Sequence, residues 1–194
     1  MSETRLYLFG AARLEVQGQA VTIDTRKALA LLAYLLIENQ PQSRDTLATL
    51  LWPESDQSAA RAALRRTLSP LRSALSDDII DFGRELIAIH LGAALWCDVI
   101  DFQALLAECR SHAHAEDQTC PRCLAPLQKA AALYQDDFMA GFSLRDSAGF
   151  DDWQFFETDR LRREFASVLE RLVAIQETQG DFVGATDDAR RWLS

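Results

Sequence analysis

The segment SRDTLATLLWPESDQSAARAALRRTLSPLRSAL, residues 43–75, predicts two helices joined by a tight turn. Ser43 is a suitable N-cap, and the leucines that follow it repeat at helical spacing. Residues 52–56, WPESD, interrupt that pattern, because a proline and the residue before it both disfavour helix. A second helix is therefore predicted for residues 57–75.

The predicted helix 57–75 has one apolar face and one basic face. Alanine and leucine recur along it every three or four positions, and no acidic residue lies between Gln57 and Ser76. The side chains that we single out as candidate DNA contacts are Ser58, Arg61, Arg65, Arg66, Ser69 and Arg72. A helix-turn-helix with this basic front suits a DNA groove, whereas a solvated basic face is the simpler explanation of such a helix on its own.

The elements expected around these two helices complete a small fold. Three short apolar segments between residues 5 and 23 predict an antiparallel β-meander, and residues 26–38 predict a buried helix. After the helix-turn-helix, residues 79–91 predict a hairpin with Arg84 at its tip. Strands, three helices and a hairpin in this order predict a winged helix. Arg84 is then either a contact to phosphate or the minor groove, or a solvated turn residue.

The chain of 194 residues is acidic, but its charge is unevenly distributed. Its formal net charge is −9. Residues 1–96 hold 10 Lys and Arg against 11 Asp and Glu, whereas residues 97–194 hold 10 against 18. The two parts therefore carry −1 and −8, so that DNA binding would depend on a local basic patch in the first part.

The sequence also indicates a compartment. No apolar run approaches the ~20 residues of a membrane span. The first ten residues lack the basic and apolar regions of a secretory signal. We therefore expect a cytoplasmic protein that does not insert in a membrane, and its four cysteines are then expected as thiols or metal ligands.

Beyond residue 96 the strand-like segments give way to helical patterns rich in alanine and acidic residues. Helices are predicted for residues 97–111, 124–134, 153–179 and 183–193. Helices paired by short turns suggest an all-α array of TPR type. We expect a mainly α chain with a small β component in two domains: a winged helix in residues 1–96 and a TPR-like domain in residues 97–194.

Both parts resemble one family, the SARP-type bacterial transcriptional activators. The segments that resemble its OmpR-like winged helix are RKAL at 26–29, SRDTL at 43–47, LWPE at 51–54 and LRRTL at 64–68. The segments that resemble its bacterial transcriptional activator domain (BTAD) are DVIDF at 98–102, ALYQDDFMAGF at 132–142, LERL at 169–172 and QGD at 179–181.

This resemblance implies a sequence-specific DNA-binding transcriptional activator. In the family the recognition helix, here residues 57–75, enters the major groove, and the hairpin, here residues 79–91, is the wing. The resemblance further implies double-stranded DNA and RNA polymerase as partners and a homodimer on DNA. It also implies that residues 97–194 are an incomplete BTAD, with further domains beyond residue 194. Pro70 departs from the uninterrupted helix of the family and predicts a kink that limits the reach of Arg72.

A cluster of cysteine and histidine residues lies between two predicted helices of the second part. Cys109 and His112 end one helix, and Cys120 and Cys123 begin the next with CxxC spacing. If the two helices are antiparallel, four N and S ligands meet, which is the set that a structural zinc prefers. His114 is an alternative to His112. Thiols without metal and a redox-active cysteine pair are the competing interpretations.

The sequence contains no motif that indicates an enzyme. The phosphate-binding, dinucleotide-binding and nucleophile-elbow patterns GxxxxGK[ST], GxGxxG and GxSxG are all absent from it. Acidic pairs such as Asp136-Asp137 fall at predicted helix ends, where capping explains them. The alternative to a DNA-binding activator is a helical protein-interaction or scaffold module whose winged helix no longer binds DNA.

Overall fold

The computed structural model describes residues 4–21, 25–75, 78–90, 92, 94–112 and 119–193. The first part contains, in chain order, β1 (Thr4–Tyr7), β2 (Arg13–Val16), β3 (Gln19–Val21), α1 (Arg26–Glu38), β4 (Gln42–Ser43), α2 (Arg44–Leu51), α3 (Gln57–Ala74), β5 (Ile80–Asp81), β6 (Leu86–Ile89) and β7 (Leu95–Cys97). The second part contains α4 (Asp98–Ser111), the short 3₁₀ helix η1 (Pro121–Cys123), α5 (Leu124–Leu133), α6 (Ala148–Gln179) and α7 (Phe182–Leu193). The mainly α fold with a small β component is therefore confirmed.

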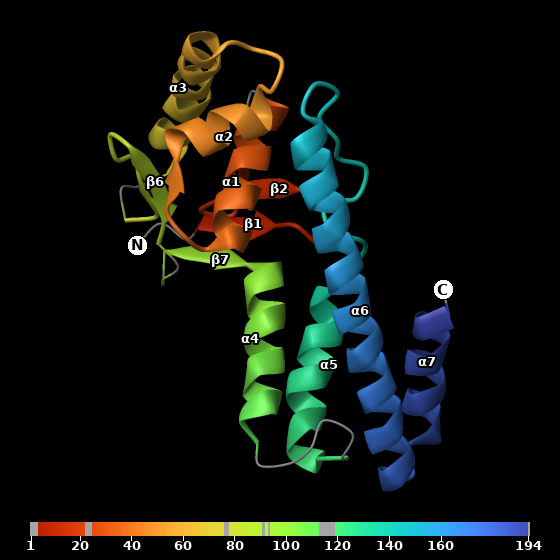
Figure 1. Ribbon diagram of the computed structural model, residues 1–194. Coiled ribbons are helices and arrows are strands. Elements are labelled where there is room, and N and C mark those ends of the chain that lie inside the picture. Colours follow the sequence, from red (N-terminus) through yellow and green to blue (C-terminus); the bar gives the residue numbers. More distant parts are fainter. Residues whose placement is uncertain are drawn as a thin grey trace.

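The mixed first part lies at one end of the molecule, and the helices α4 to α7 extend from it (Figure 1). α4 packs on α5, α5 on α6, and α6 on α7, as in an array of helical hairpins. α6 begins at Ala148, earlier than the sequence pattern predicts, and ends at Gln179, where it is capped by Gly180, whose φ of 79° favours glycine. No helix in the described part of the chain is long and apolar enough to cross a membrane.

Side-chain caps start the three helices of the first part. Thr25, Ser43 and Asp56 each accept a hydrogen bond from the backbone N–H three residues further on. The apolar faces of α1, α2 and α3 then pack on one another. Local sequence therefore accounts for the helix-turn-helix and for the turn, residues 52–56, between its two helices.

Two small sheets flank these helices. One has the strand order β3-β2-β1-β7, antiparallel except that β7 runs parallel to β1. The other has the order β4-β6-β5, in which β5 and β6 form the expected hairpin. The sequence pattern does not predict β4 or β7, which are too short to show a period of their own. Cys97, expected to begin a helix, is instead the last residue of β7.

Pro70 does not end the helix that contains it. α3 continues past the expected kink to Ala74. Proline removes the N–H that would bond to the carbonyl oxygen of Arg66. However, the leucines on either side of it, Leu68 and Leu71, are only 5% and 0% exposed. Their burial holds the last turns of α3 in helical form.

One continuous core joins the two parts of the chain. At its centre the buried carboxylate of Asp98 accepts hydrogen bonds from the N–H groups of Leu8, Phe9 and Val99 at 2.9, 3.0 and 2.8 Å. On the other side of the same segment, the Met139 N–H donates to the Leu8 carbonyl oxygen at 2.7 Å. The start of α4 and the loop after α5 are thereby anchored to the residues that follow β1.

A second set of contacts attaches α6 to the helices of the first part. The Ser147 hydroxyl donates to the carbonyl oxygen of Leu51 at 2.7 Å, and the indole N–H of Trp153 donates to Glu38 at 2.8 Å. The same indole packs edge-on against Tyr34, with 5.0 Å between ring centroids. These contacts set the position of the helix-turn-helix relative to the helical array.

Candidate nucleic-acid interface

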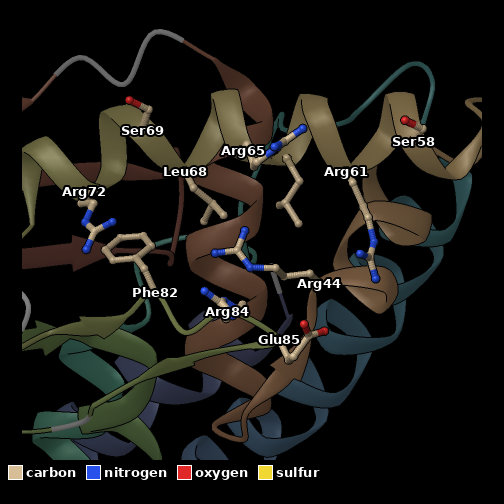
Figure 2. A pocket seen from close by; sticks show the side chains of 11 residues that line it. Arg44, Ser58, Arg61, Arg65, Leu68, Ser69, Arg72, Phe82, Arg84 and Glu85 are labelled. Carbon is tan, nitrogen blue, oxygen red and sulfur yellow. The ribbon is translucent and has the colours of Figure 1, made fainter.

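A basic cleft lies between α3 and the turn that joins β5 to β6. Its volume is about 650 Å³. Figure 2 shows α3 along one side of the cleft and the hairpin side chains along the other. The residues that line it are Arg44, Ser58, Arg61, Leu64, Arg65, Leu68, Ser69, Arg72, Phe82, Arg84 and Glu85. Five arginines against one glutamate make this lining positive in a chain whose net charge is −9.

Helical spacing explains why the basic side of α3 faces the cleft. The buried residues of α3 recur every three or four positions and pack toward α1 and α2. The exposed residues on the cleft side recur at similar spacing, and they are Ser58, Arg61, Arg65, Ser69 and Arg72. With Arg84 from the hairpin, six of the seven candidate contacts named from the sequence meet in one cleft.

The seventh candidate, Arg66, does not line this cleft. It is exposed and lines a second cleft of about 800 Å³, in which Lys27 and Asp146 also take part. Successive residues of a helix point about 100° apart. Arg65 and Arg66 therefore face different surfaces, although they are neighbours in sequence.

Arg61 is paired with a carboxylate at the edge of the cleft. Its Nε and Nη2 atoms donate to the Asp45 carboxylate at 2.5 and 2.7 Å, and both side chains are exposed. The hydrogen bond from Arg61 holds the pKa of Asp45 below its usual value. Asp45 therefore competes with any phosphate for this guanidinium group.

Arg44 ties the hairpin turn to the start of α2. Its Nε and Nη2 atoms donate to the Gly83 carbonyl oxygen at 3.1 and 3.0 Å, and its backbone N–H donates to the Glu85 carbonyl oxygen at 3.0 Å. A Cβ added at Gly83 would lie 2.5 Å from the carbonyl oxygen of Leu86, so this turn needs glycine. Sequence reasoning did not find Arg44, because no local signal shows that it reaches a turn so distant in the chain.

The other arginines of the cleft differ in their surroundings. Arg72 lies over the ring of Phe82, with its Cζ atom 5.3 Å from the ring centroid. Among the residues that the structure describes, no carboxylate forms an ion pair with Arg65 or Arg84. These two guanidinium groups are therefore accessible to a phosphate or a base edge.

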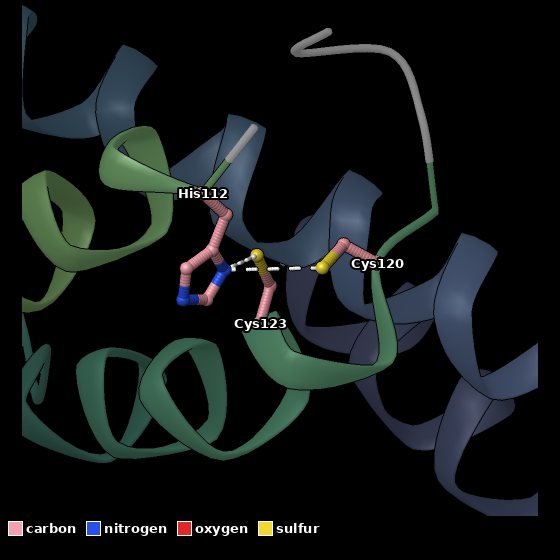
Figure 3. Close-up of side chains that lie close together, drawn as sticks. All are labelled: His112, Cys120 and Cys123. Atoms are coloured by element: carbon pink, nitrogen blue, oxygen red, sulfur yellow. Dashed lines mark hydrogen bonds between the residues drawn. The ribbon is translucent and has the colours of Figure 1, made fainter. Parts of the chain in front are cut away.

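A second cluster of polar side chains lies at the far end of α4. His112 directly follows the last turn of α4. Cys120 precedes η1, and Cys123 is the last residue of η1. The His112 Nδ1 atom is 3.2 Å from Cys123 Sγ and 3.8 Å from Cys120 Sγ (Figure 3). The three ligand atoms lie within 4.8 Å of one another, so the cluster could hold a metal ion.

Cys109 lies next to this cluster. Its side chain is fully buried, and its thiol lies 3.9 Å from the Cys123 carbonyl oxygen. Burial, followed by hydrogen bonds with Cys109 and Cys120, raises the pKa of the Cys123 thiol to about 12. A coordinated cation has the opposite effect, because metal-bound thiols are deprotonated. The alternative ligand His114 lies outside the described residues.

Fold and cleft together define a class of protein: a winged helix with a basic cleft between α3 and the β5–β6 hairpin, joined to a helical array. In sequence the chain is 39% identical over 75 residues to the transcriptional regulatory protein EmbR of Mycobacterium tuberculosis and of Mycobacterium bovis. The aligned segment covers 38% of this chain and 19% of EmbR. No protein-family model matches the sequence.

The fold is also that of EmbR. The solved structure of M. tuberculosis EmbR in complex with a low-affinity phosphopeptide matches with a TM-score of 0.66 and 19% identity. The match covers 99% of this chain and 59% of the EmbR chain, so this chain spans little more than half of that protein. The expected resemblance to SARP-type regulators is confirmed by this EmbR-like sequence and fold. EmbR, which the chain matches both in sequence and in fold, is a transcriptional regulatory protein.

Proposed function

We propose that this chain is a sequence-specific, DNA-binding transcriptional activator. α3 enters the major groove, whose width of about 12 Å admits an α-helix, and the β5–β6 hairpin is the wing. The observation that carries the proposal is the cleft between these two elements, which gathers five arginines in an otherwise acidic chain. Sequence similarity to EmbR, a transcriptional regulatory protein, supports it.

The side chains of the cleft then have separate tasks. Arg65 projects from the middle of α3 and reads a guanine edge or binds a phosphate. Arg84 binds a phosphate or the minor groove from the wing. Arg61 exchanges its carboxylate partner for a phosphate, and the hydroxyl groups of Ser58 and Ser69 donate to the DNA backbone.

We assign DNA binding to residues 1–96, and dimerisation or contact with RNA polymerase to residues 97–194. The net charge of −8 on the second part keeps it away from DNA. Exposed aromatic side chains on α6 and α7 suit a protein contact: Phe155, Phe156 and Phe182 are each 68% exposed. These same side chains favour the second candidate function, a protein-interaction module whose winged helix does not bind DNA.

We also propose zinc, in a structural role, as the metal that suits the cluster of His112, Cys120 and Cys123. Thiolate and imidazole ligands select zinc among the common divalent ions of cells. A DNA-binding bacterial regulator acts in the cytoplasm, where cysteine thiols stay reduced and free to coordinate.

Selection of bound duplexes from a random DNA library by the full chain tests the proposed function. We expect one enriched motif, in two half-sites spaced by about one helical turn if the chain binds as a dimer. The enriched duplex should bind about a thousandfold more tightly than a scrambled one. A library without enrichment, together with equal affinity for the duplexes and for heparin, would leave only the protein-interaction module.

A further inference from the structure

The cysteine and histidine cluster spans the adjoining ends of two helices. α4 leads away from the first part, and α5 packs along it in the opposite direction (Figure 1). His112 comes from the end of α4, whereas Cys120 and Cys123 come from the segment that starts α5. Ligands from both helices therefore meet at one point.

The spacing of these atoms matches that of a tetrahedral zinc site. With Zn–S bonds of about 2.3 Å and a Zn–N bond of about 2.0 Å, ligand atoms lie roughly 3.5–3.8 Å apart. The Nδ1 atom of His112 lies 3.2 and 3.8 Å from the sulfur atoms of Cys123 and Cys120. The two sulfur atoms also lie within 4.8 Å of each other.

Cys109 is placed to supply the fourth ligand. It lies in the last turn of α4, three residues before His112, which directly follows the helix. Its thiol is buried beside Cys123. Cys97, by contrast, precedes α4 and is separated from Cys109 by roughly 18 Å of helix at 1.5 Å per residue. Cys97 is therefore a buried cysteine outside the cluster.

We propose that Cys109, His112, Cys120 and Cys123 bind one Zn²⁺ ion in a closed site that clamps α4 to α5. The proposal rests on the zinc assignment above and is independent of DNA binding. Each cysteine releases its thiol proton to solvent on coordination, and neutral His112 binds through Nδ1. Four protein ligands leave no open position, so the site is structural rather than catalytic.

The clamp also supports the contact between the two parts of the chain. Phe102 on α4 and Tyr134 after α5 both pack against Phe9, with ring centroids 5.4 and 4.6 Å apart. Fixing the far end of the α4–α5 hairpin keeps these two rings aligned on Phe9. Metal binding is then coupled to the stability of the hairpin and of the contact that it makes with the first part.

Metal analysis and zinc X-ray absorption on the unaltered full chain test the proposal without a substitution. We expect one zinc per chain, bound by three sulfur atoms and one nitrogen atom. A chelator should lower the melting temperature, and added zinc should restore it. A chain that binds no zinc, or that holds Cys120 and Cys123 as a disulfide, would overturn the clamp. Zinc bound through only two sulfur atoms would overturn the role of Cys109.

Matched variants identify the ligands. Cys109→Ser should weaken zinc binding by at least about tenfold. Loss of a residue that only supports a metal ligand can already cost this much, and loss of a ligand should cost no less. Cys97→Ser removes a buried thiol outside the cluster and should keep full zinc affinity. Equal zinc affinity of the two variants would contradict the proposed ligand set. Arg65→Ala should bind DNA about tenfold more weakly or worse but keep its zinc, so that failure of one proposal is distinguishable from failure of the other.

Discussion

Asp45 and Arg61 form an exposed pair at the edge of the basic cleft. Asp45→Asn frees the guanidinium group and removes a negative charge that would face the DNA backbone. We therefore predict that this variant binds the selected duplex a few-fold more tightly at low salt, as measured by fluorescence anisotropy. Asp187→Asn, which breaks an exposed pair with Arg190 on α7, is the control and should not change the affinity. Weaker binding by the Asp45 variant would contradict the competition.

Asp137 makes the stability of the chain depend on pH. The hydrogen bond from Arg162 lowers the pKa of Asp137, which also accepts a hydrogen bond from Tyr134 at 3.1 Å. A lowered pKa in the folded state contributes stability above the unfolded value of about 3.9, and this contribution is lost as the pH falls through the folded value. Asp137→Asn should therefore be less stable than the parent at neutral pH, and the difference should shrink below about pH 4. Urea unfolding across that range measures it, and a difference independent of pH would refute the assignment.

At the residue scale, the sequence predicts which faces of α3 are apolar and basic, but not what lies opposite them. Helical periodicity alone places Arg61, Arg65 and Arg72 on one flank, where the structure also has them. The same periodicity puts Arg66 on another face of α3. A prediction that treats all the arginines of this helix as one group does not separate Arg66 from the others. The role of Arg44 depends on a turn that is distant in sequence, and no local pattern reveals it.

The proline in α3 gives a prediction about a single element. Pro70→Ala restores a backbone N–H within hydrogen-bonding reach of the Arg66 carbonyl oxygen. We expect the free energy of unfolding to rise by roughly 2 kcal/mol. The gain from the restored hydrogen bond is partly offset, because the unfolded chain has more conformational freedom without the proline. DNA affinity should not change, because Pro70 does not line the cleft. A less stable variant would contradict this prediction. It would show that Pro70 contributes more stability at its site than the missing hydrogen bond costs.

The elements that could be predicted are those with their own caps and periods. The expected helix 26–38 has the same bounds in the structure, and Ser43 caps α2 as expected. β4 and β7 could not be predicted, because they contain two and three residues and depend on pairing with β6 and β1. The continuation of α3 past Pro70 depends on tertiary burial, which overrides local preference.

At the scale of the whole molecule, the buried carboxylate of Asp98 joins the residues that follow β1 to the start of α4. Asp98→Ala leaves the N–H groups of Leu8, Phe9 and Val99 without this acceptor. The expected loss of stability is roughly 3 kcal/mol or more. Asp101→Ala, on the exposed side of the same helix, is the control and should cost much less.

Urea unfolding followed at several wavelengths measures both effects. Because the core is continuous, the parent chain should unfold in one transition, and the Asp98 variant should shift that transition as a whole. Two well-separated transitions in the parent chain would instead show that residues 1–96 and 97–194 fold independently.

The salt dependence of binding to the selected duplex tests the central claim, that the cleft between α3 and the wing holds DNA. Arg65→Ala and Arg84→Ala should each weaken binding by about tenfold or more. Loss of a phosphate contact should also make the slope of log K against log salt shallower by about 0.9. Arg66→Ala removes another exposed arginine, which faces the other cleft, and it should keep both affinity and slope. Equal losses in all three variants, or no loss from Arg65→Ala and Arg84→Ala, would contradict this account.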